Sequence, residues 1–182
     1  MWKRFKGVLV VVMFACGLAS CNSAKNAAAP VPEAEQAVSV ALKNLYMAAS
    51  AAPPHSAEQQ KIILQMATQA ANGKELLLVM RAAVGVFPAS PSSRESSAES
   101  RVRTLVTAKM LQFGTLDQLI EYATQYSVDP AYARRMIQRI FQLAGDSTNP
   151  RVWYRVKTAA YHLQVSDMER QAQIRAEQLA GR

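Results

Sequence analysis

The chain has 182 residues, half of them hydrophobic, and a formal net charge of +8. Residues 22–73 are neutral overall, 74–114 carry +3 and 115–182 carry +2, so the charge is spread along the chain. A nucleic-acid-binding protein would concentrate basic residues on one face, and we therefore expect no nucleic-acid partner. About 160 residues after the N-terminal region are enough for one domain with its own hydrophobic core.

The first twenty residues predict a secretory signal. Lys3, Arg4 and Lys6 precede an uncharged apolar run over residues 8–15. Even with residues 16–19 this run is shorter than the ~20 residues that a membrane-spanning helix needs. A basic start followed by a short apolar core is typical of a cleaved signal peptide.

The sequence Leu18-Ala19-Ser20-Cys21 resembles the lipobox of bacterial lipoproteins, in which a Leu and two small residues precede a lipid-modified Cys. The resemblance implies that Cys21 becomes the lipidated N-terminus. Two or more acyl chains on this residue would anchor the protein stably to a bilayer. By the rule of that family Asn22, in place of Asp, points to the outer membrane, facing the periplasm. An ordinary signal peptide with an incidental Cys is the alternative.

Cys16 and Cys21 are the only cysteines, and Cys16 would leave with the signal peptide. The remaining domain would then have no disulfide and no Cys-ligated metal, so its stability would depend on its hydrophobic core. We expect residues 1–20 to be removed, residues 21–33 to form a lipidated, flexible tether and residues 34–182 to fold. A Pro- and Ser-rich loop at 88–97 divides the domain into two parts.

Apolar residues at helical spacing predict four helices before position 114, over 38–49, 56–70, 75–87 and 102–113. Ser56 with Gln59 forms a capping box, and Gly73 is expected as a C-cap. The segment 75–87 is apolar on nearly every side except at Arg81, which is typical of a buried central helix.

Repeated start signals predict four more helices in the last 68 residues. They are Thr115 with Gln118, Asp129-Pro130, Asn149-Pro150 and Ser166 with Glu169. Short connections make neighbouring helices antiparallel. The sequence therefore predicts an all-α fold of about eight helices in antiparallel hairpins.

The caps Thr115 and Asn149 lie 34 residues apart, which is the period of tetratricopeptide repeats. The stretch "NPRVWYRVKTAAY" weakly resembles the first helix of such a repeat, although Lys157 stands where a small Gly is expected. The resemblance implies a repeat-like stack of helical hairpins, either a solenoid or a bundle.

No pattern in the sequence predicts a catalytic, cofactor or metal site. His55 and His162 have no metal-ligating partner at i+3 or i+4. Glu75 and Glu121 are the acids that a peptidoglycan-cleaving enzyme could use, but both are expected to be solvated. The helix dipole would lower the pKa of Glu75, whereas a general acid needs a raised one.

Eight of the ten aromatic residues after Cys21 lie between positions 113 and 161. Tyr154 and Tyr161 fall on the helix face opposite Trp153, and two further tyrosines form an i, i+4 pair. Tyr and Arg are favoured at protein interfaces, although neighbouring helices could instead cover these rings. The predicted partner surface comprises Tyr122, Tyr126, Arg151, Tyr154, Arg155 and Tyr161.

These features favour a non-enzymatic adaptor or assembly factor of an envelope machine, such as a secretion, pilus or conjugation system. It would contact the membrane through its lipid anchor and bind an envelope protein, with the oligomeric state left open. A carrier of an apolar ligand is the alternative, since eight methionines and the segment 75–87 could line a cavity. A peptidoglycan-active enzyme ranks third.

Overall fold

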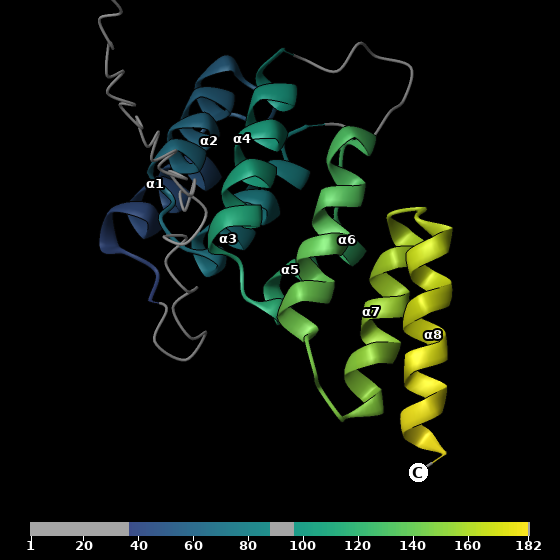
Figure 1. Ribbon diagram of the computed structural model, residues 1–182. Helices are drawn as coiled ribbons and strands as arrows, with labels where there is room; N and C mark the ends of the chain where they lie inside the picture. Colours follow the sequence, from purple (N-terminus) through teal and green to yellow (C-terminus); the bar gives the residue numbers. More distant parts are fainter. Residues whose placement is uncertain (1–36, 88–96, 182) are drawn as a thin grey trace, which may run out of the picture.

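The computed structural model describes residues 37–87 and 97–181, and all of their regular elements are α-helices. The all-α prediction is thereby confirmed. The predicted signal peptide, Cys21, the tether and the loop residues 88–96 lie outside the described residues. The eight helices are α1 (Val40–Ala51), α2 (Ala57–Gln69), α3 (Gly73–Val84), α4 (Ser97–Phe113), α5 (Leu116–Gln125), α6 (Pro130–Ala144), α7 (Pro150–His162) and α8 (Ser166–Ala180) (Figure 1).

The helices form two layers of stacked hairpins. Each odd-numbered helix contacts the next, from α1 through α3 and α5 to α7, and α2, α4 and α6 form the second layer in the same way. The odd-numbered helices begin at residues 40, 73, 116 and 150, which are spacings of 33, 43 and 34. The longer spacing contains the nine residues 88–96. The predicted hairpin stack is confirmed, with α1 and α8 at opposite ends (Figure 1).

Three of the four predicted start signals of the second half work as predicted. Thr115 and Gln118 form a complete capping box at α5. Asp129 accepts a hydrogen bond from the Ala131 amide at 2.8 Å, and Asn149 accepts one from the Arg151 amide at 3.0 Å. Each side chain satisfies an amide that the first turn of a helix leaves unpaired.

Three predicted caps differ from the structure. Gly73 does not end α2 but begins α3, behind Asn72 as N-cap. A Cβ at Gly73 would lie 1.9 Å from Oε1 of Gln118, so the glycine allows α3 to approach the start of α5 closely. Ser166 lies inside α8 and makes no cap, because the helix already starts after Val165.

The third difference is partial. Ser56 accepts a hydrogen bond from the Gln59 amide, as predicted. The Gln59 side chain, however, accepts its bond from the His55 amide rather than that of Ser56.

α3 is the central helix, as predicted. It contacts α1, α2, α4 and α5, and Leu76 and Val79 are fully buried. Leu78 is only half-buried and Val84 is exposed, so the apolar run is not covered on every side. Among the helices of residues 37–87 and 97–181, none combines the length and apolar character needed to cross a bilayer.

Candidate partner-binding surface

The inner side of α7 fixes the rotation of this helix. Trp153, Val156 and Ala160 are buried there. The Trp153 ring packs edge-on against Phe141 with 5.4 Å between centroids, and its Nε1 donates a hydrogen bond to the Ser147 carbonyl at 2.9 Å. A helix has 3.6 residues per turn, so Tyr154 and Tyr161, which are seven residues apart, lie on the same side of α7. That side is away from the buried residues Val156 and Ala160.

The outer side of α7 carries the two predicted interface tyrosines. Tyr154 is 45% exposed and Tyr161 is 65% exposed, so neighbouring helices leave nearly half of Tyr154 and about two-thirds of Tyr161 accessible. Arg151, Arg155 and Thr158 share the same side and are also exposed. We call these five residues the α7 face.

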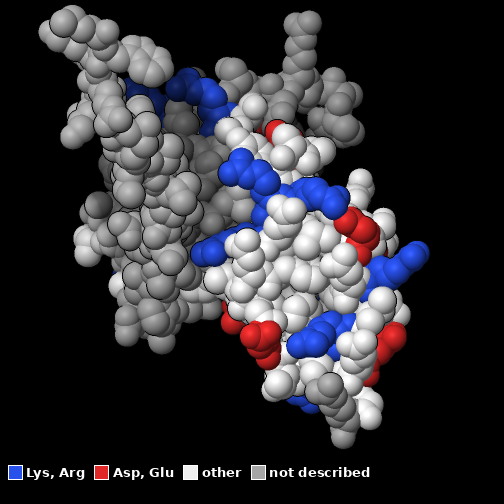
Figure 2. All heavy atoms as spheres, viewed as in Figure 1, with Lys and Arg blue, Asp and Glu red and all other residues white. Residues whose placement is uncertain are grey.

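One of the two arginines of the α7 face is paired with an acidic side chain. Arg155 forms an ion pair with Asp117 in the first turn of α5, and Tyr161 packs edge-on against His162 at 5.8 Å. Figure 2 shows basic and acidic side chains interspersed over one side of the molecule. This distribution agrees with the thin spread of charge in the sequence.

Tyr122 does not belong to a partner surface. Its side chain is 0% exposed, and its hydroxyl lies 2.7 Å from Oγ1 of Thr107 on α4. Burial raises its pKa above the ordinary value, although the hydrogen bond with Thr107 opposes this. The prediction was wrong because the Tyr122 hydroxyl pairs with Thr107 of α4 inside the stack, a contact that the apolar stripe of α5 alone does not reveal.

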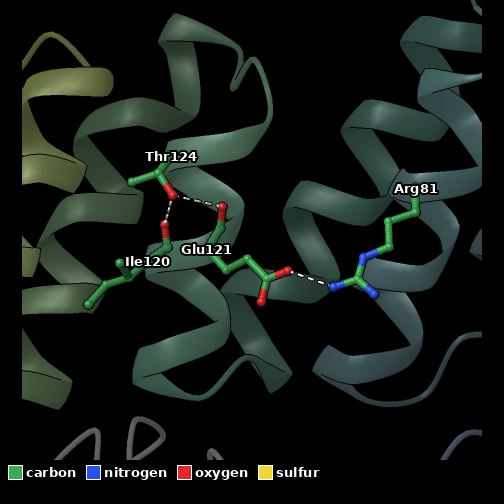
Figure 3. A network of polar contacts seen from close by, with 4 residues as sticks. All are labelled: Arg81, Ile120, Glu121 and Thr124. Atoms are coloured by element: carbon green, nitrogen blue, oxygen red, sulfur yellow. Dashed lines mark hydrogen bonds and ion pairs between the residues drawn. The ribbon is translucent and has the colours of Figure 1, made fainter.

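Tyr126 is half-buried and lies among groups that join α3 to α5. Burial raises the pKa of Tyr126, and a hydrogen bond with Arg81 opposes the shift. Nη2 of Arg81 also donates to Oε1 of Glu121 at 2.9 Å (Figure 3). Glu121 was expected to be solvated, but it is partly buried and paired, so it helps to hold two helices together.

Glu75 is buried, with 2% of its surface exposed. Its carboxylate accepts hydrogen bonds from the Ser39 and Ala71 amides, both at 2.8 Å. Burial alone would raise the pKa of Glu75, but the hydrogen bonds from the backbone at Ala71, Ser39 and Asn72 lower it overall. The expected direction of the pKa shift is confirmed, whereas the expected solvation is wrong because the Ser39 amide arrives from a distant part of the sequence.

The two histidines lie far from each other in the sequence and make different contacts. Nδ1 of His55 lies 2.7 Å from the Val86 carbonyl, whereas His162 packs against Tyr161. Within residues 37–87 and 97–181, no group of three His, Cys, Asp or Glu side chains could hold a metal ion.

Two hollows bear on the carrier alternative. A cavity of about 150 Å³ between α3, α4 and α5 is lined in part by Met80, Phe87 and Tyr126. A wider cleft of about 530 Å³ lies at the α5–α6 and α7–α8 turns and includes Arg134 and His162. Small-molecule pockets are usually ~300–1,000 Å³ and mostly apolar, so the first hollow is small for an apolar ligand and the second has charged and polar walls.

No family model, curated protein or solved structure matches the chain. The candidate surface is therefore defined by the geometry of this chain alone. Sequence periodicity was sufficient to find Tyr154 and Tyr161, because both follow from the position of Trp153 on the same helix.

Proposed function

We propose that the protein is a non-enzymatic, lipid-anchored adaptor of the bacterial cell envelope, which holds a protein partner near the outer membrane. Cys21 would carry the lipid, and the α7 face would bind the partner. The exposure of Tyr154 and Tyr161 beside two arginines, on a helix whose rotation Trp153 fixes, carries this proposal.

The chemistry of the α7 face suits a protein partner better than a small molecule. Tyr and Arg dominate interface hot spots because they offer large contact areas and directional hydrogen bonds. Tyr154 and Tyr161 are seven residues apart, which is about 10.5 Å along the helix axis. A helix or strand of a partner could therefore contact both rings at once.

Native purification tests the adaptor function. The full chain, tagged at its C-terminus, would be extracted in mild detergent and its co-purifying molecules identified by mass spectrometry. The parent is compared with Tyr154→Ala/Tyr161→Ala and with Ile174→Ala, which removes an exposed apolar side chain from α8. We expect a stoichiometric protein partner with the parent and the control but not with the double variant.

Other outcomes would contradict this proposal. A bound lipid or small molecule without a protein would favour the carrier alternative. A protein partner that the double variant retains would exclude the α7 face as its binding site.

The lipid anchor has its own test. Cys21→Ser should leave the signal uncleaved at this site and the protein without lipid, which mass spectrometry of the extracted protein measures. If this variant is still cleaved and the cleaved protein still partitions into the detergent phase, Cys21 is not the anchor.

A further inference from the structure

α1 has an unusually apolar outer face. Val40 and Met47 are 71% and 67% exposed, and both lie on the side of the helix opposite the buried residues Leu42 and Ala49. The only charged residue of this helix is Lys43, and the exposed Asn44 lies between Val40 and Met47 on the same side. We call Val40, Lys43, Asn44 and Met47 the α1 face.

The other end of the stack is finished differently. α8 has five charged residues, of which four, Asp167, Arg170, Arg175 and Glu177, are exposed. Stacked helical repeats need a polar outer face on their terminal elements to remain soluble. α8 meets this requirement, whereas the α1 face does not, so the α1 face calls for a covering surface.

Two side chains fix where the chain enters α1. Glu75 accepts the hydrogen bond from the Ser39 amide, and Nδ2 of Asn72 donates to the Ala37 carbonyl at 3.1 Å. Ala37 is 16 residues after Cys21. Sixteen residues span at most about 53–58 Å when fully extended, so a lipid on Cys21 would hold this entry point within that distance of the bilayer.

We infer that the α1 face lies on the membrane surface, with Val40 and Met47 in the interface and Lys43 against anionic headgroups. This inference rests on the lipid anchor of the proposed function. An apolar helix face with a basic flank and no acidic residue is suited to anionic lipid. Because the odd-numbered helices contact one another in order from α1 to α7, this orientation places α7 at a distance from the membrane.

A fluorescent probe at one site tests the inference. Met47→Cys and the control Ile174→Cys would be made in the full chain and labelled with an environment-sensitive dye, since a lipidated Cys21 leaves no other thiol after signal cleavage. The labelled proteins are reconstituted into phosphatidylethanolamine and phosphatidylglycerol vesicles containing a quencher attached to the lipid chains. We expect a shift to shorter emission wavelength and several-fold stronger quenching at position 47 than at position 174.

The result separates the inference from the anchor. If the protein floats with the vesicles but both positions are quenched equally, the anchor stands and the inference is overturned. If the protein does not float, both fail. A disulfide-linked Met47→Cys dimer would also overturn the inference, because a second copy would then cover the α1 face. A probe at position 47 that is already shielded in vesicle-free Cys21→Ser protein would overturn it too, because the protein's own N-terminal segment would then cover that face.

Discussion

The first four helices and the last four share one hydrophobic core but add different contacts to it. In the first four, polar side chains bind backbone groups: Nζ of Lys109, for example, donates to the carbonyls of Ala67, Thr68 and Ala70 at the end of α2. In the last four, aromatic packing around Trp153 takes this role. In the first four helices, polar side chains bind the backbone where the chain enters α1. In the last four, the Trp153 ring is buried, whereas Tyr154 and Tyr161 remain available for contact.

The largest expected loss of stability comes from a substitution in the last four helices. Trp153→Ala should lower the free energy of unfolding by about 3–5 kcal/mol, because it removes a buried ring and leaves a cavity. Chemical denaturation measures the loss. Trp153→Phe keeps a ring but loses the hydrogen bond to Ser147, so its cost should be clearly smaller. Equal costs for the two variants would show that ring packing does not hold this half together.

A second variant tests the contribution of polar contacts to the stability of the first four helices. Glu75→Gln should cost about 1–3 kcal/mol at neutral pH, because an amide cannot accept both backbone hydrogen bonds that the carboxylate accepts. The exposed Glu58→Gln is the control and should change stability by no more than about 0.5 kcal/mol.

The same pair gives a pH dependence with a definite sign. The folded-state pKa of Glu75 lies below the ordinary value of 4.5, so its contribution is present above that value and is lost as pH falls through the folded-state pKa. The difference in stability between the parent and Glu75→Gln should therefore shrink in acid. A difference that grows below pH 4.5 would contradict the assigned role.

A smaller effect is expected where the two halves meet. Tyr122→Phe should cost about 0.5–1.5 kcal/mol, because it removes the hydrogen bond between Tyr122 and Thr107 and leaves the Thr107 hydroxyl buried without its partner. Adding Thr107→Val should recover part of the loss, since both polar groups are then gone. Additive losses in this double-mutant cycle would show that the two hydroxyls do not interact.

Signals within one helix predicted the fold well, but contacts between distant segments could not be read from them. Thr115, Asp129 and Asn149 marked helix starts because a cap needs only its own first turn. Glu75 looked solvated because its partner at Ser39 lies 36 residues earlier, and Tyr122 looked exposed because its partner Thr107 lies 15 residues earlier, on α4.

The α7 face was predictable for the opposite reason. Trp153 determines which side of α7 is buried, so the positions of Tyr154 and Tyr161 follow from helical geometry alone. The α1 face was not predicted because the apolar spacing over 38–49 does not single out Val40 and Met47, and only the packing of α1 on α2 and α3 shows which side remains outside.

The central claim is that Tyr154 and Tyr161 serve recognition and not folding. Thermal and chemical unfolding of Tyr154→Ala/Tyr161→Ala, measured beside Trp153→Ala in the same buffer, test this claim most directly. The double variant should unfold within about 0.5 kcal/mol of the parent, as surface substitutions usually do, while Trp153→Ala is strongly destabilised. A loss of several kcal/mol in the double variant would show that the two tyrosines belong to the packed structure and would remove the α7 face as a binding surface.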